Sequence, residues 1–142
     1  MVDLLTNIGE EYLVENNADG ETVTVGLYND GTDALGETAT LSDITTEPSG
    51  SAYARQSSAV TTAQISGDFG FDNDAQLTFD TSDSSQTVDA AFVVVNFTSD
   101  TVAGDGSATD HLVAAGDLDQ SRDLSQIDEL NINAGDLDVT LN

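Results

Sequence analysis

The sequence predicts an all-β protein, an antiparallel β-sandwich of jelly-roll type with one short N-terminal α-helix. Short segments rich in β-branched and aromatic residues recur along the chain, separated by Gly, Asn, Asp and Ser, which is typical of sandwiches. Residues 90–97 (AAFVVVNF) form the longest apolar run, and such a run predicts a central strand covered on both faces. Val23, Val25 and Leu27 alternate with polar residues, so residues 22–28 are expected to form a half-buried strand.

The N-terminal segment 3–16 is the one predicted helix. Leu4, Ile8 and Tyr12 recur at a spacing of four residues and would form one apolar stripe. Asp3 can cap its start, and the Asn-Asn-Ala-Asp-Gly run that follows is expected to end it. So short a helix is marginal alone, so we expect it to pack against the sheet or a neighbouring subunit.

The rest of the chain reads as strands and loops. Residues 68–71 and 76–79 are predicted to pair as a hairpin that bends at 72–74. Leu41 and Ile44 lie in a loop and are expected to touch the core. Further strands are predicted at 53–60, 62–66, 111–118, 127–132 and 137–141. Turns or loops are predicted at 29–31, 32–50, 82–86 and 101–110.

The length of 142 residues predicts a single domain over 1–142, with the helix at 3–16 and the sheets in 22–142. The chain carries 27 acidic residues against two arginines and no lysine, a net charge of -25. This charge would strain a folded chain in dilute buffer. At molar salt the Debye length falls to about 3 Å, which nearly removes the repulsion. The acids are spread between apolar alternations, so we expect a folded halophilic protein and not a disordered acidic chain.

The composition also excludes classes of partner and chemistry. Nucleic acids and anionic membrane surfaces require cationic groups, which this chain almost lacks. There is no cysteine, so disulfides and thiolate metal sites are excluded. Met1 is followed by neither a basic nor an apolar stretch, so we expect no signal peptide and synthesis in the host cytoplasm. No apolar run approaches the length of about 20 residues that a membrane span needs.

Three segments together resemble a family of small structural proteins of tailed viruses, labelled tail-fibre or head-decoration proteins. They are residues 5–11 with the strand ending at 27–28, the Gly-Ser-Ala-Tyr-Ala-Arg-Gln run at 50–56, and the ending from 112 to 141. The family usually carries a Trp in its middle region, and this sequence has none. With the charge, the resemblance implies a virion component of a haloarchaeal tailed virus that assembles as a trimer or pentamer.

The two arginines and the lone histidine are candidate site residues. Arg55 and Arg122 are expected to pair with carboxylates, either across a subunit interface or within the chain between strands. His111 would need a nucleophile and an orienting acid to be catalytic. No nucleophile-elbow sequence accompanies it, so we interpret it as a strand-end residue.

Clustered acids suggest sites for Ca²⁺ or Mg²⁺, which prefer oxygen ligands. Asp72 and Asp74 are the candidates, with residues 29–33 and the pair Asp117 and Asp119 as further clusters. With so many acids, solvated acidic turns are the default interpretation, and no cofactor is expected. Glycoside hydrolysis by paired carboxylates usually requires an aromatic cleft, and the chain has three Tyr and no Trp.

These observations predict a non-enzymatic virion protein, a decoration or turret subunit on the outer surface of the capsid. Its expected partners are copies of itself and the major capsid protein or other virion proteins. A compact acidic domain suits a surface that faces brine and not packaged DNA. The alternatives are a tail, baseplate or receptor-binding component that contacts host glycans and, less favoured, a secreted acidic enzyme or carbohydrate-binding domain.

Overall fold

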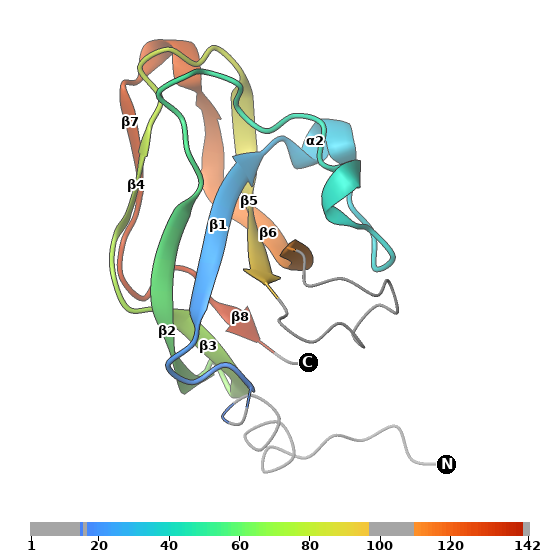
Figure 1. Cartoon of the computed structure of the whole chain (residues 1–142), viewed down its shortest axis with the longest axis vertical. Helices are drawn as coiled ribbons and strands as arrows, with labels where there is room; N and C mark the ends of the chain where they lie inside the picture. The colour runs from blue at the N-terminus through green and yellow to red at the C-terminus, as the bar shows by residue number, and fades with distance from the viewer. Residues whose placement is uncertain (1–14, 16, 97–109, 141–142) are drawn as a thin grey trace. The chain divides into compact units, whose positions relative to one another are not determined.

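The computed structural model describes residues 15, 17–96 and 110–140. About half of these residues lie in strands, helices are few and short, and the all-β prediction is confirmed (Figure 1). The predicted helix at 3–16 and the predicted loop at 101–110 lie outside the described residues, apart from Glu15, which is helical, and Asp110, which begins a strand. The chain divides into two compact units, which are described one at a time.

The larger unit, residues 24–56 and 78–130, is built around strand β5 (Thr87–Asn96). β5 pairs antiparallel with β1 (Thr22–Tyr28) on one side and with β6 (Asp110–Asp123) on the other. Every residue from Ala90 to Val94 is buried, because both faces of the strand are covered, as its unbroken apolar run predicts. The bounds of β1 are those predicted, while β5 begins earlier than predicted.

Gly26 in β1 is explained by the residue opposite it. It faces Phe92 across the β1–β5 pair, and a Cβ at position 26 would overlap the Phe92 ring. The Tyr28 ring meets the same ring edge-on, with centroids 6.0 Å apart. The missing side chain is therefore what lets the Phe92 ring lie over the neighbouring strand.

One face of this sheet is covered by the chain between β1 and residue 50. This stretch contains two single turns of helix, α2 (Asp30–Asp33) and η1 (Leu41–Asp43). Its apolar side chains Leu35, Leu41 and Ile44 pack, together with Leu112 of β6, against a buried cluster. The members of that cluster are Tyr28, Ala90, Phe92 and Val94. The prediction that Leu41 and Ile44 touch the core is confirmed.

Strand β6 is longer than the predicted 111–118 and irregular. Val93 pairs with Ala114 while Val94 pairs with Leu112, so Val113 is an extra, bulged residue. Among the described residues, Val113 is a large apolar residue that is exposed, with 43% of its surface accessible. After β6 come η2 (Leu124–Gln126) and β7 (Glu129–Ile132), which pairs with β4 (Leu77–Asp80).

The smaller unit contains a β-hairpin with a two-residue turn. Its described residues include 57–77 and 131–140. β2 (Gln56–Ile65) pairs antiparallel with β3 (Asp68–Asn73). Ser66 and Gly67 form the turn with φ values of 53° and 106°, the positive values that match the strand twist. β3 pairs in turn with β8 (Val139–Thr140), a shorter strand than predicted.

This hairpin corrects two predictions. The separate strands 53–60 and 62–66 are one strand, β2, which begins only at Gln56. The predicted hairpin between 68–71 and 76–79 is wrong, because β3 pairs with β2 and β8 while β4 pairs with β7. The turn that forms is the one where a Gly supplies a positive φ, whereas residues 72–74 keep negative φ.

Asn73, at the end of β3, holds the following segment in place. Its side chain is buried, donates to the carbonyls of Ala75 (2.7 Å) and Asn133 (2.9 Å), and accepts from the amide of Leu137 (3.0 Å). A buried amide with all these partners is a satisfied structural element. It fixes the chain that leads into β8.

Candidate functional site

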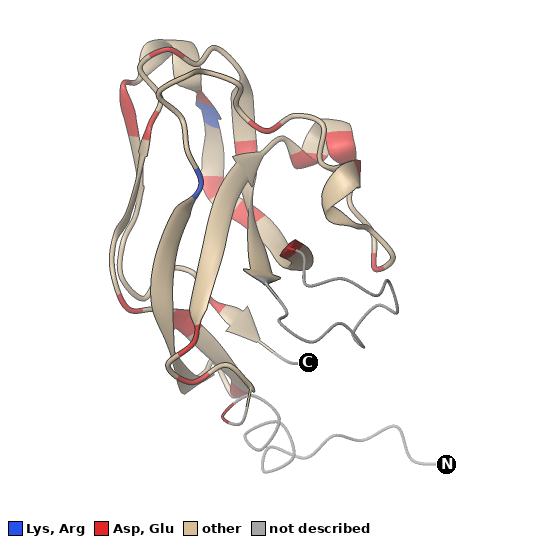
Figure 2. Cartoon of the chain, in the orientation of Figure 1, with Lys and Arg blue, Asp and Glu red and all other residues tan. Residues whose placement is uncertain are grey.

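Acidic residues are spread over strands and turns, and the two arginines stand alone among them (Figure 2). Arg122 pairs with Asp119 at 2.9 Å, three residues earlier in β6. Asp119 is 76% exposed, so this pair contributes little to stability. It lies within one strand and joins no two strands.

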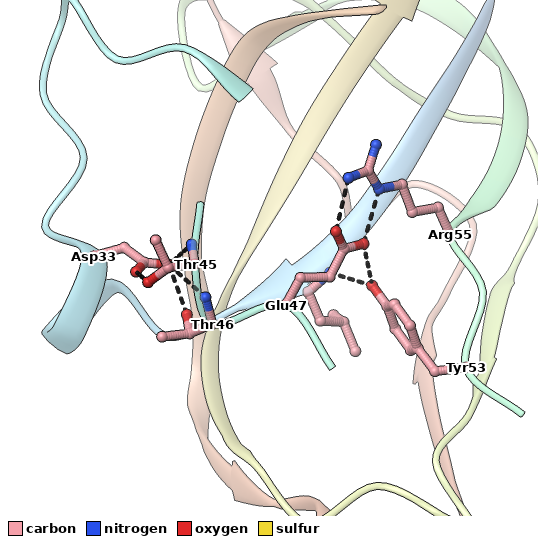
Figure 3. A network of polar contacts seen from close by, with 7 residues as sticks. Asp33, Thr45, Thr46, Glu47, Tyr53 and Arg55 are labelled. Carbon is pink, nitrogen blue, oxygen red and sulfur yellow. Dashed lines mark hydrogen bonds and ion pairs between the residues drawn. The ribbon is translucent and has the colours of Figure 1, made fainter. Parts of the chain in front are cut away.

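Arg55 has a different environment. Its Nε and one terminal nitrogen donate to the two carboxylate oxygens of Glu47 at 2.8 and 2.7 Å (Figure 3). The two side chains are 29% and 22% exposed. The guanidinium also lies over the Phe92 ring, 5.0 Å from its centroid, a cation–π contact. The hydrogen bonds from Arg55 to Glu47 raise the pKa of the guanidinium.

Tyr53 extends this ion pair to β1. Its hydroxyl donates to Glu47 Oε1 (3.2 Å) and accepts from the backbone N–H of Leu27 (2.9 Å) (Figure 3). Its ring stacks on Phe79, with centroids 6.1 Å apart. Burial raises the pKa of the Tyr53 hydroxyl, which therefore stays protonated and can donate. The tyrosine thus supplies the acceptor that Leu27 would otherwise need from another strand.

Asp33 ties the two ends of a loop together. Its carboxylate accepts four hydrogen bonds, from the backbone N–H and the hydroxyl of both Thr45 and Thr46, at 2.6–3.1 Å (Figure 3). Desolvation opposes ionisation of this carboxyl, but the hydrogen bonds outweigh it and lower its pKa. Thr46 Oγ1 also accepts a hydrogen bond from the backbone N–H of Asn29 at 2.7 Å.

Asp30, the other acid of the predicted 29–33 cluster, is also engaged in hydrogen bonds. Asp30 accepts from the Tyr28 hydroxyl (2.9 Å) and from the Leu35 amide (3.3 Å). The Asp30 amide donates to Asp89 at 2.6 Å. Burial and the Asp30 contact raise the pKa of Tyr28. This cluster therefore fastens α2 to β1 and β5 through hydrogen bonds.

The other predicted site residues make none of the hydrogen bonds described above. Asp72 is in β3, and Asp74 just beyond it accepts from Thr61 at 2.6 Å. Asp117 is opposite Ala90 in the β5–β6 pair, and His111 is opposite Val95. In the described part of the chain, no three His, Cys, Asp or Glu side chains gather in a way that could hold a metal ion.

The sequence predicted only part of this hydrogen-bond network. Arg55 was singled out by its rarity, but Glu47, Tyr53 and the Asp33–Thr45–Thr46 cluster were not. Tyr53 and Arg55 are two residues apart in the segment that leads into β2, and in extended chain this spacing places two side chains on the same side. Asp33 and its threonines are 12 and 13 residues apart, and nothing local in the sequence indicates that contact.

The arrangement holds loops in place: the carboxylates of Asp33 and Glu47 accept hydrogen bonds from N–H and O–H donors, and the raised pKa values of Tyr28 and Tyr53 keep their hydroxyls protonated. No protein-family model, curated protein sequence or solved structure matches the chain. Among the described residues, no helix is both long and apolar enough to cross a membrane.

Proposed function

We propose that the chain is a structural subunit of a virus particle, a decoration or turret protein on the outer capsid surface of a halophilic tailed virus. The observation that supports this proposal is the pairing of its two arginines, Arg55 and Arg122, with acids of the same chain. The net charge is -25, and both arginines are already paired with carboxylates of the same chain. The remaining surface repels DNA and is suited to face concentrated salt.

The sequence resemblance supplies the viral assignment, and the fastened loops fit a passive role. Arg55 and Asp33 bind residues within the segment 29–55, Glu47 and Thr46 respectively, and Tyr53 joins that segment to Leu27 of β1. In this proposal the strands form a jelly-roll-like β-sandwich that acts without a catalytic site or an obligatory cofactor. It assembles as a trimer or pentamer on the major capsid protein.

Particles made without the protein provide the test. Purified protein added back in molar salt is expected to bind isolated heads and to be present in many copies, one set at each symmetry-related position. Isolated tails from the same preparation are the control. Binding to tails alone, in few copies, would favour the alternative of a tail, baseplate or receptor-binding component, and hydrolysis of a sugar or ester would contradict both.

A further inference from the structure

Residues 34–44, here called the flap, are largely self-contained. Their backbone hydrogen bonds close local turns, Ala39 to Gly36 at 2.9 Å and Asp43 to Thr40 at 3.0 Å. The Asp43 carboxylate accepts from the Thr40 amide and hydroxyl, which caps η1. Between described residues, no hydrogen bond joins 36–44 to β1, β5 or β6. The flap therefore has its own structure and does not borrow that of the sheet.

Apolar contacts hold the flap on the sheet. Leu35, Leu41 and Ile44 are only half-buried, whereas Tyr28 and Phe92 beneath them are at most 2% exposed. Because these side chains are only partly buried, each stabilises the closed flap less than a fully buried side chain would. The buried face below would become accessible to solvent if they lifted.

The polar contacts gather where the flap begins and ends. Asp33 immediately precedes it, and Thr45 and Thr46 immediately follow it, joined by the four hydrogen bonds already described. A compact loop whose ends meet in this way has the form of an Ω-loop. Losing the carboxylate would remove all four of these hydrogen bonds at once, and leave the two ends held by the Leu35 N–H to Asp30 and by the Asn29 N–H to Thr46.

We propose that the flap opens as a unit while the sheet stays folded, and that Asp33 with Thr45 and Thr46 is the latch that keeps it closed over the Tyr28–Phe92 face. Local openings of this kind cost less free energy than global unfolding. Opening would uncover an apolar surface that the closed chain hides. This inference goes beyond the proposed role on a capsid and holds for the isolated protein.

Thiol labelling can test the proposal because the chain has no cysteine. Val94 belongs to the cluster under the flap, while its neighbour Val93 points to the opposite face of β5; both are at most 2% exposed. Val94→Cys is the probe and Val93→Cys the matched control. Each is combined with Asp33→Ala, and the rate of modification by an aromatic disulfide reagent is measured in molar salt under native conditions.

Asp33→Ala is expected to raise the labelling rate of Cys at 94 by about tenfold or more, as the loss of charge-assisted hydrogen bonds predicts, and to leave Cys at 93 unchanged. Asp80→Ala, which removes a turn carboxylate outside the flap, is expected to change neither rate. An unchanged rate at 94 would overturn the proposal. If Asp33→Ala raises the labelling rates at 93 and 94 alike, the milder variant Thr45→Val is measured, because it removes one hydroxyl of the latch and preserves the shape of the side chain. An equal rise at 93 and 94 in Thr45→Val would also overturn the proposal.

Discussion

At the scale of the residue, the two arginines show how environment sets the value of an ion pair. Arg55 meets Glu47 through two hydrogen bonds, and its guanidinium carbon lies over the Phe92 ring. Arg122 meets a mostly exposed Asp119 through one nitrogen. A lysine has a single ammonium group and could not form the two-pronged hydrogen bond to Glu47 while it keeps the contact with Phe92. The Arg122–Asp119 pair depends on neither feature.

Exchanging each arginine for lysine tests this difference. Arg55→Lys is expected to lower the free energy of unfolding by about 1–3 kcal/mol, because one charge-assisted hydrogen bond and the contact with the ring are lost. Arg122→Lys, the matched control, is expected to stay within about 0.5 kcal/mol of the parent. Urea denaturation in 2–3 M salt measures both, and equal effects of the two substitutions would contradict the assignment.

At the scale of the element, β1 and β5 depend on a pairing of the smallest residue with a large ring. Gly26→Ala is expected to destabilise the protein by about 1–3 kcal/mol through overpacking against Phe92. The double variant Gly26→Ala with Phe92→Leu should cost less than the sum of the two single changes, because the smaller side chain makes room. Additive costs in a double-mutant cycle measured by urea denaturation would show that the ring does not limit position 26.

The sequence was sufficient where a signal was local. The alternation of Val23, Val25 and Leu27 predicts β1 with the bounds it has, and the apolar run predicts the buried centre of β5. Which strands pair with each other was harder to predict from the sequence. β3 and β4 are adjacent in sequence and each could form a hairpin strand, yet β4 pairs with β7, some fifty residues away in sequence.

The candidate site was predicted even less completely. The rarity of Arg55 drew attention to it, but its partner Glu47 is one of 27 acids. Which acid pairs with it depends on how the loop folds back, and composition carries no information on that. Local Asp–Ser turns are the exception: Asp80 accepts from Ser82, and Asp123 from Ser125, two residues on. That short-range pattern could have been predicted.

At the scale of the whole molecule, carboxylates are stabilised mainly by N–H and O–H donors, since cations are so few. Asp33, Asp43, Asp80 and Asp83 each accept from a Ser or Thr hydroxyl and from at least one backbone N–H. These hydrogen bonds lower the pKa of all four carboxyl groups. Folding therefore favours their ionised form.

Acidification in high salt should reveal this preference. Because the folded pKa values lie below the unfolded value of 3.8, their contribution to stability is fully present above the unfolded pKa and is lost as the pH falls through the folded pKa values. Unfolding by urea in 3 M salt is expected to become easier from about pH 4 downward, since screening removes the opposing benefit of discharging the chain. Stability that rises over this range would contradict the account.

The salt dependence of folding tests the central claim most directly, that a domain with a net charge of -25 is folded only where its self-repulsion is screened. Far-ultraviolet circular dichroism should show a β spectrum in molar salt. That spectrum should be lost below about 0.5 M, where the Debye length exceeds about 4 Å. An unchanged β spectrum and an unchanged thermal midpoint in millimolar salt would contradict the claim.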